Sequence, residues 1–175
     1  MHDELLQFQR NDIWTLAPRL EGEHIISTKW IFRNKTDKEG NVICNKARLV
    51  AQWYSQMEGV DYDKTIALVA HMESIRILLA LACHLKFKLY QMDVKTAFLN
   101  EILKEDVYVA QPKGFIDPHF LDHVLYLKKA LYKLKQALRA WYNQLTQYLV
   151  SQGFTRGKAD QSLFIKREDG ELIVA

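Results

Sequence analysis

The segment 91–100, QMDVKTAFLN, holds the residues of this chain that are best suited to chemistry. Asp93 follows the mainly apolar stretch 87–92, and Phe98 comes five residues later. We predict a strand over 87–93 that ends at the Asp93 carboxylate. Magnesium prefers carboxylate oxygens as ligands, so Asp93 is a candidate metal ligand. Taken alone, an aspartate at a strand end is more often a turn or cap residue. Other parts of the chain are needed to distinguish a metal ligand from a turn residue.

Two stretches of the chain are rich in cations. Residues 29–48 contain six lysines or arginines and two acids, and residues 126–141 contain five cations, no acids and interleaved aromatic residues. Cations with aromatic residues between them suit a phosphate backbone and stacked bases. A solvated surface explains the charge equally well, so these stretches alone do not establish nucleic-acid binding.

Size and composition predict an intracellular globular domain. The chain has 175 residues, 49% of them hydrophobic, and a net charge of +3, which is enough for one well-buried core. It contains no apolar run long enough to cross a membrane, and its polar, acid-containing start is not typical of a signal peptide. Cys44 and Cys83 form neither a metal-binding spacing nor a disulfide framework. We therefore expect a reducing compartment and buried thiols.

The order of the expected elements indicates an α+β fold, because helices and strands mix without a βαβ repeat. A hairpin is expected from 28–33 and 42–52, with turn residues at 39–41 between them. Residues 72–87 form a largely apolar helix that should be buried on most sides. Further elements are expected as helices over 3–10 and 138–152, the latter ended by Gly153, and as strands over 107–110, 124–127, 161–166 and 171–175.

Four long motifs resemble one known family. QMDVKTAFLN, KARLVAQ, DHVLYLKKALYKLKQALRAWY and GFTRGKADQSLFIK are similar, in order and spacing, to copia-type retrotransposon reverse transcriptases. The resemblance runs from about Trp14 to the last residue. It implies the right-hand polymerase fold with fingers and a partial palm, in which an antiparallel sheet packs on helices. The implied fingers are residues 1–85 and 108–138, and the implied palm is 86–107 and 139–175.

The resemblance also implies roles for individual residues. Asp93 matches the first catalytic, metal-binding aspartate, and Phe98 matches the bulky residue that excludes a ribose 2′-hydroxyl. Lys46 and Arg48 match the contacts to the incoming triphosphate, and Gln136 matches the glutamine over the nucleotide and template. The remaining basic residues implied to bind nucleic acid are Lys29, Lys128, Lys129, Lys135 and Arg139.

The same resemblance implies the cofactor and the partners. Magnesium would be the cofactor, and the partners would be an RNA or DNA primer–template and deoxynucleoside triphosphates, with no membrane involved. The implied location is the cytoplasm, within a virus-like particle. The oligomeric state does not follow from the sequence.

The 175 residues lack the Tyr-x-Asp-Asp motif that supplies the other two metal-binding acids in this family. One carboxylate cannot hold two magnesium ions, so we expect a chain truncated before that motif to be inactive alone. We therefore interpret the chain as a fragment of such a reverse transcriptase. Two alternatives stay open, namely a non-catalytic remnant that binds nucleic acid and a decayed copy of the element with no selected role.

Several positions depart from the family's pattern, and two other acid or histidine groupings are weaker candidates. Bulky residues replace glycine at Trp53, Glu101 and Lys133, which can strain a turn that needs positive φ. Leu68 and Leu138 stand where proline is usual, and His71 where arginine is usual. Asp61 with Asp63, and His119 with His123, have spacings seen in metal sites, but each lacks further ligands.

Overall fold

In a computed structural model of the chain, the structure describes residues 1–63, 65, 70–94, 96–100, 102–168 and 170–175. The chain divides into two compact units, one of Met1–Thr65 with Thr96–Trp141 and one of Ile66–Lys95 with Tyr142–Ala175. Helices and strands mix along the chain, which confirms the α+β prediction. The assignment of residue ranges to fingers and palm stays a prediction.

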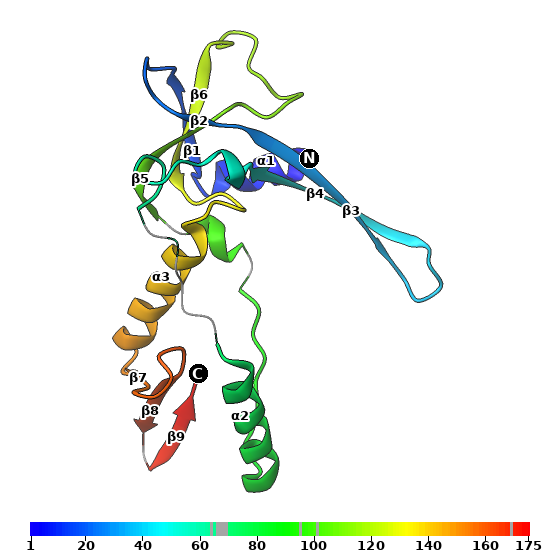
Figure 1. The fold of residues 1–175 in the computed structure, drawn as a ribbon. Coiled ribbons are helices and arrows are strands. Elements are labelled where there is room, and N and C mark those ends of the chain that lie inside the picture. The colour runs from blue at the N-terminus through cyan, green and yellow to red at the C-terminus, as the bar shows by residue number, and fades with distance from the viewer. Residues whose placement is uncertain (64, 66–69, 95, 101, 169) are drawn as a thin grey trace. The chain divides into compact units, whose positions relative to one another are not determined.

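The first unit is built on a four-stranded sheet in the order β1-β6-β5-β2 (Figure 1). β6 (His123–Lys129) pairs antiparallel with both β1 (Trp14–Pro18) and β5 (Ile102–Val109), and β2 (Ile25–Ile26) pairs parallel with β5. Helix α1 (His2–Arg10) buries Phe8, which packs with sheet residues such as Val107 and Leu127. The predicted strands at 107–110 and 124–127 are therefore confirmed as the centre of the sheet.

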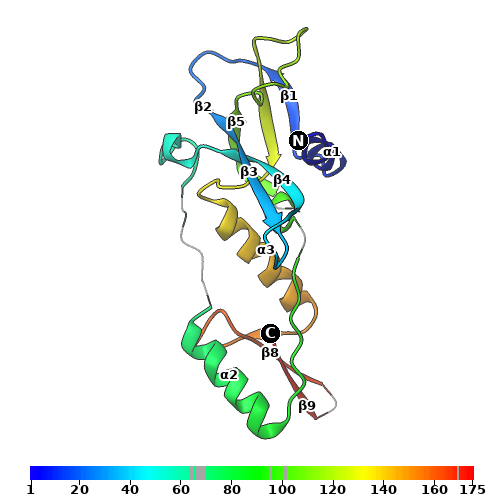
Figure 2. The ribbon, with the colours of Figure 1, turned by 90° about the vertical axis from the view of Figure 1, so that its right-hand side faces the viewer.

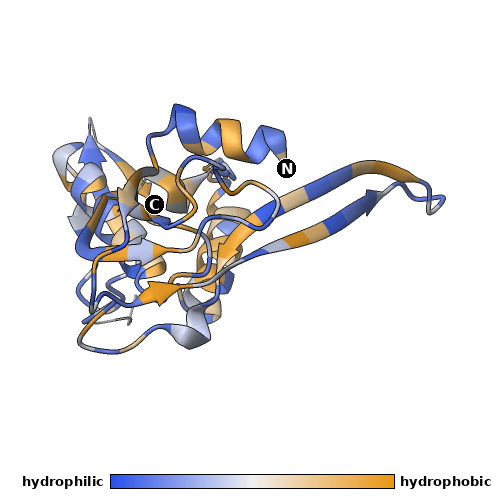
Figure 3. Cartoon of the chain, turned by 90° about the horizontal axis from the view of Figure 1, so that it is seen from above, coloured by the Kyte–Doolittle hydropathy of each residue, from blue (hydrophilic) through white to orange (hydrophobic). Residues whose placement is uncertain are grey.

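The predicted hairpin is also confirmed. β3 (Thr28–Thr36) and β4 (Val42–Ala51) pair antiparallel, with Trp30 opposite Leu49. Asn41 N–H donates to the Asp37 carboxylate at 2.8 Å, and Gly40 has φ +90°, a conformation that glycine adopts without strain. Figure 3 shows hydrophilic and hydrophobic residues mixed along both strands. Only the base of the hairpin is buried, because Leu49, Val50 and Ala51 are at most 5% exposed and the residues before them in β4 are not buried.

Two short 3₁₀ helices, η1 (Trp53–Ser55) and η2 (Ala97–Asn100), complete the first unit. Trp53 and Lys133, which replace the family's glycines, differ in backbone conformation. Lys133 has φ +68°, in the region that favours glycine, whereas Trp53 does not have positive φ. The strain expected from these departures is thus confirmed at Lys133 and wrong at Trp53. Leu68 and Glu101 lie outside the described residues.

In the second unit, two predictions about helix α2 (Met72–Leu85) and the segment after it are wrong. Only Ala82 of α2 is buried, and apolar side chains such as Ile77 and Leu79 are more than half exposed. The described residues 87–94 form no strand, and Tyr90 and Met92 are 78% and 87% exposed. A strand needs partners for its backbone N–H and C=O groups, and the described part of this unit supplies none there. Composition alone could not show that α2 is exposed or that residues 87–94 lack a strand partner.

Most of helix α3 (Ala137–Ser151) and three strands complete the second unit (Figure 2), with the strand predicted over 161–166 found as β8 (Phe164–Glu168) and with β7 (Thr155–Arg156) not predicted. Helix α3 is followed by Gly153, whose φ of +84° closes the helix as predicted. A three-stranded antiparallel sheet follows in the order β7, β8 and β9 (Glu171–Val174). Asp160 accepts hydrogen bonds from Ser162 and from Ser74 of α2, which joins α2 to the loop before β8.

The expected burial of the thiols is wrong. Cys44 and Cys83 are both free and exposed. Cys44 lies in the exposed part of the hairpin, and Cys83 lies on α2, where few side chains are covered. No helix within the described residues is long and apolar enough to cross a membrane.

Candidate phosphate-binding face and site residues

One face of the hairpin gathers its cations. In the antiparallel register, Arg33 lies opposite Lys46 and Ile31 lies opposite Arg48. Directly opposed residues share a face of the sheet, and Lys35 follows Arg33 on that face because side chains alternate. All four cations are exposed. Like charges placed opposite each other destabilise a strand pair, so this face gains stability when an anion binds it.

The basic face borders a groove of about 740 Å³. Its lining is mostly polar or cationic and consists of Ile31, Arg33, Asn34, Lys35, Thr36, Ile43, Lys46 and Arg48. Arginine donates two parallel hydrogen bonds to phosphate oxygens, and lysine offers a compact charge. The groove therefore has the chemistry of a phosphate-binding surface.

Arg48 contacts an aromatic residue outside the hairpin. Its guanidinium carbon lies 5.7 Å from the centroid of the Tyr132 ring, within cation–π range. Tyr132 is half-buried, and burial raises the pKa of its hydroxyl, as does the charge of Glu4, while Arg48 opposes both. Arg48 of β4 and Tyr132 of the segment after β6 are thus in contact.

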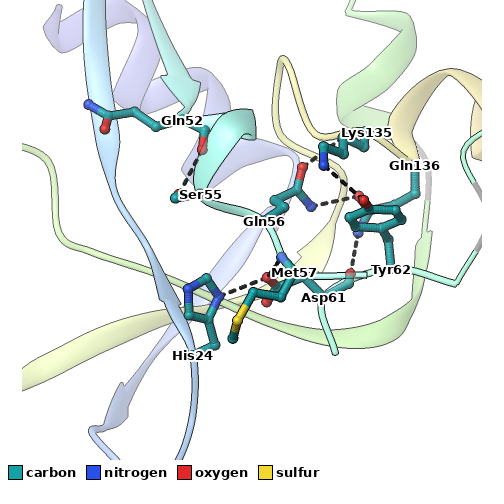
Figure 4. Close-up of polar contacts among 9 residues, drawn as sticks. All are labelled: His24, Gln52, Ser55, Gln56, Met57, Asp61, Tyr62, Lys135 and Gln136. Atoms are coloured by element: carbon teal, nitrogen blue, oxygen red, sulfur yellow. Dashed lines mark hydrogen bonds and ion pairs between the residues drawn. The ribbon is translucent and has the colours of Figure 1, made fainter. Parts of the chain in front are cut away.

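Gln136 lies inside a network of buried amides rather than at a surface (Figure 4). It is 3% exposed, its Oε1 accepts from Gln56 Nε2 at 3.0 Å, and its Nε2 donates to the Asp61 carbonyl at 2.9 Å. Gln56 Oε1 in turn accepts from the backbone N–H of Lys135 at 2.9 Å. The network fixes segment 56–62 against the start of α3. The predicted contact of Gln136 with a nucleotide stays a prediction, and it would require these bonds to open.

Asp61 shares this network, and its carboxylate has intramolecular hydrogen-bond partners. Its carboxylate is buried and accepts from the Met57 N–H at 2.7 Å, with His24 Nδ1 also 2.7 Å away (Figure 4). Among the residues that the structure describes, no three acids, histidines or cysteines are grouped so that they could hold a metal ion. The Asp61–Asp63 and His119–His123 spacings therefore have no metal site to support them.

The other cations predicted to bind nucleic acid lie in different surroundings. Lys128 Nζ lies 2.9 Å from both carboxylate oxygens of Asp12, and Lys129 Nζ donates to the Asn11 carbonyl at 2.6 Å. Lys135 Nζ donates to the Tyr62 hydroxyl at 2.8 Å and lies 4.5 Å from that ring's centroid. Lys29 is exposed on the hairpin, and Arg139 is half-buried in the first turn of α3. Because side chains alternate along β3, Lys29 shares the basic face with Arg33. The two lysines of β6 already have intramolecular partners.

Asp93 and Phe98 lie in segment 91–100. Asp93 is exposed in an irregular stretch, not at a strand end. Phe98 lies in η2, and its side chain is outside what the structure describes.

Magnesium is the cofactor that the resemblance implies, and the described residues do not fit a complete site for it. A magnesium ion keeps several waters but needs carboxylates that converge on it. Asp93 is a single exposed carboxylate, and the described part of the chain groups no other acids into a metal cluster. Asp93 remains a candidate for one ligand of a larger set.

Sequence reasoning missed Glu4, Gln56 and Tyr132. Gln56 is buried and polar, and its partner Gln136 is 80 residues away in the sequence, which no local pattern reveals. Tyr132 belongs to the basic stretch 126–141, whose composition does not reveal a contact with Arg48. Glu4 precedes the region of resemblance, and only its place in the first turn of a helix was visible.

Comparison with known proteins decides the family. The family described as reverse transcriptase (RNA-dependent DNA polymerase) matches residues 11–175. The chain belongs to the reverse transcriptase family. It is 42% identical over 164 residues to the retrovirus-related Pol polyprotein from transposon RE1 of Arabidopsis thaliana, covering 93% of this chain and 11% of that protein. The corresponding polyprotein of transposon TNT 1-94 from Nicotiana tabacum is 36% identical over 167 residues, covering 95% and 13%.

A more distant relative is the transposon Ty1-DR5 Gag-Pol polyprotein of Saccharomyces cerevisiae, 28% identical over 159 residues, which are 86% of this chain and 8% of that protein. These relatives confirm the copia-type resemblance. This reverse transcriptase sequence spans about a tenth of the length of the RE1 and TNT 1-94 polyproteins. No solved structure gives a significant match.

Proposed function

We propose that this reverse transcriptase chain binds the phosphates of a primer–template and of an incoming deoxynucleoside triphosphate for RNA-directed DNA synthesis. The observation that carries the proposal is the register of the hairpin. It places Arg33, Lys46 and Arg48 on one exposed face beside a groove. A bound anion relieves the repulsion between Arg33 and the opposed Lys46, and the family acts on polyanionic substrates.

In this proposal, Lys46 and Arg48 contact the triphosphate, and Lys29 and Arg139 contact the nucleic-acid backbone. Lys128, Lys129 and Lys135 contribute to the same field, but their intramolecular partners reduce their share. Asp93 is proposed as one acid of the catalytic set, and Phe98 as the residue that excludes a ribose 2′-hydroxyl. Right-hand polymerase architecture, with fingers and part of a palm, is part of the same proposal.

Binding without catalysis is a second candidate for a protein made of these 175 residues alone. The basic face is complete within the described residues, whereas the sequence contains no Tyr-x-Asp-Asp motif. Such a protein should bind a primer–template and should not extend it.

The test is the salt dependence of binding to a fluorescent RNA–DNA primer–template, compared among three proteins. The first is the unchanged chain, the second has Lys35, Lys46 and Arg48 changed to alanine, and the third has Lys88, Lys158 and Arg167 changed to alanine. The two triple variants lose the same charge, and all six residues are exposed.

Each phosphate contact adds about 0.9 to the slope of log affinity against log salt on B-form DNA. We expect the hairpin variant to lower this slope by about 2 to 3 and the control variant to leave it almost unchanged. Equal slopes in the two triple variants would show that the hairpin face is not the phosphate-binding surface.

A further inference from the structure

Two exposed aromatic residues lie next to each other directly after the hairpin. Trp53 and Tyr54 belong to η1 and are 51% and 69% exposed. Their ring centroids are 6.4 Å apart, and the ring planes are inclined by 74°. Covering rings of this size is favourable because it removes a large apolar area from water. The pair is therefore available to a ligand that offers flat, apolar surface.

The backbone that carries the two rings is fixed by hydrogen bonds. The Gln52 N–H donates to the Ser27 carbonyl at 2.9 Å, and the Gln56 N–H donates to the Trp53 carbonyl at 3.2 Å. The Ser55 hydroxyl donates to the Gln52 carbonyl at 2.7 Å (Figure 4). The side chain of Gln56 is part of the buried amide network. Because η1 is held at both ends, a ligand that covers the rings does not have to order the backbone first.

The orientation of Tyr54 and the identity of residue 53 both favour an exposed aromatic surface. The Tyr54 hydroxyl donates to the amide oxygen of Gln52, so its polar group has a partner and its ring faces stay free for apolar contacts. Trp53 stands where the resembled family usually has glycine, and its backbone does not have positive φ. The indole is thus an addition in this chain that the local backbone accepts without strain.

The surroundings of the pair indicate nucleic acid as the ligand. Arg48 of the basic face precedes Trp53 by five residues, so their Cα atoms lie within about 18 Å of each other. Lys29 of the same face lies opposite Val50, at the base of the hairpin. Residues 52–57 contain no acid that would repel a phosphate. Cations that hold a backbone and aromatic rings that stack on bases are the combination that binds single strands.

We propose that Trp53 and Tyr54 form a stacking platform for the unpaired bases of a single strand that extends from the bound primer–template. Bases inside a duplex already stack on each other, so only an unpaired stretch offers free base faces to the rings. Every base has such a face, so the platform tolerates any sequence. The inference rests on the proposed function, because the basic face holds the phosphates of the same nucleic acid.

The experiment compares three ligands at one salt concentration by fluorescence anisotropy. The first is a blunt RNA–DNA duplex, and the second is the same duplex with a single-stranded RNA extension of about ten nucleotides. The third carries an extension of the same length without bases, which keeps the phosphates and removes the stacking faces. The proteins are the unchanged chain, Trp53→Ala, Trp53→Phe, Tyr54→Ala and Tyr90→Ala. Tyr90→Ala is the matched control for Tyr54→Ala, because Tyr90 is 78% exposed and lies outside η1.

We expect the unchanged chain to bind the extension with bases more tightly than the other two ligands. Trp53→Ala should weaken binding to that ligand by about five- to a hundredfold, the range for one base stacked on an aromatic ring, and should leave binding to the abasic ligand unchanged. Trp53→Phe keeps a ring and should lose less than Trp53→Ala. Tyr54→Ala should also weaken binding to the extension with bases, and Tyr90→Ala should bind every ligand as the unchanged chain does.

The comparison of the two extensions on the unchanged chain needs no variant to fold. Equal affinity for the extensions with and without bases would overturn the stacking platform. The proposed function would survive that result if the chain still binds the blunt duplex and loses this binding when Lys35, Lys46 and Arg48 are changed to alanine. Absence of binding to all three ligands would overturn both proposals.

Two further outcomes would also overturn the platform. Trp53→Ala could weaken binding to the blunt duplex and to the extended duplex by the same factor, which would show that the indole does not act on unpaired bases. Trp53→Ala could instead change the sedimentation of the free chain and leave its affinity for the extended duplex unchanged. That result would identify the aromatic pair as a contact between protein chains.

Discussion

Gln56 and Gln136 bond to each other across 80 positions of the sequence, with Gln56 Nε2 donating to Gln136 Oε1 at 3.0 Å. Each amide also bonds to the backbone, Gln136 to the Asp61 carbonyl and Gln56 to the Lys135 N–H. A buried amide whose partners are all satisfied is expensive to remove, because truncation leaves those partners without hydrogen bonds. The pair therefore holds the start of α3 against segment 56–62.

The first prediction is that Gln136→Ala destabilises the fold. The change leaves the Gln56 amide and the Asp61 carbonyl unpaired in a buried site, so we expect a loss of about 2 to 3 kcal/mol in the free energy of unfolding. Gln147→Ala is the control, because Gln147 is exposed on the same helix. Urea denaturation checks the pair, and equal losses in both variants would show that the network contributes no stability.

The second prediction concerns the backbone at Lys133, which has φ +68°. A side chain in the left-handed region costs about 1 to 2 kcal/mol, and glycine has no such cost. We expect Lys133→Gly to stabilise the chain by about 1 kcal/mol, since the gain is partly offset by a more flexible unfolded chain. Lys133→Ala removes the same charge but keeps Cβ, so it should give no gain. A thermal melt in which both variants rise equally would assign the effect to charge rather than to backbone strain.

The third prediction is an acid-sensitive contact in the second unit. Hydrogen bonds from the Ser162 hydroxyl, the Ser74 hydroxyl and the Ser162 N–H lower the pKa of Asp160 from 3.8 to about 2. A lowered pKa stabilises the folded state at pH values above the unfolded value of 3.8, and that stability is lost as the pH falls through about 2. The free energy of unfolding should therefore fall with pH across this window.

Asp160→Asn and Ser74→Ala separate the contributions to that slope. The asparagine variant cannot titrate, so it should be less sensitive to acid between about pH 4 and about pH 2. The alanine variant removes one donor and should have an intermediate slope. If the unchanged chain and Asp160→Asn lose stability in parallel, the Asp160 contacts do not determine acid sensitivity.

The fold was predictable wherever a local pattern decided it. Alternation and the turn around Gly40 predicted the hairpin, and apolar spacing followed by Gly153 predicted α3. The segment 87–93 and the burial of α2 were predicted wrongly, because both depend on whether another surface covers them, which composition does not encode. The basic character of the hairpin was visible in the sequence, but its concentration on one face came from the register of Arg33 with Lys46.

Site residues were predictable only through the resemblance, which named Asp93, Arg48 and Gln136 without their surroundings. The burial of Gln136 follows from partners far away in the sequence, so no spacing rule could have found it. Glu4 was unpredictable for the same reason, since α1 meets β4 only in the folded unit. Charge patterns locate a candidate surface, whereas tertiary contacts decide which of its cations are available.

The most direct test of the central claim is nucleotide incorporation on a primed RNA template. The chain of 175 residues is compared with the same chain extended by a Tyr-Val-Asp-Asp hairpin strand, with the extended chain carrying Asp93→Asn, and with the extended chain carrying Asp63→Asn as a matched control. We expect no incorporation by the unextended chain, weak incorporation by the extended chain and by its Asp63→Asn form, and none by Asp93→Asn, because Asp93 is the proposed catalytic acid of these residues. Incorporation by the unextended chain, or incorporation that survives Asp93→Asn, would contradict the account.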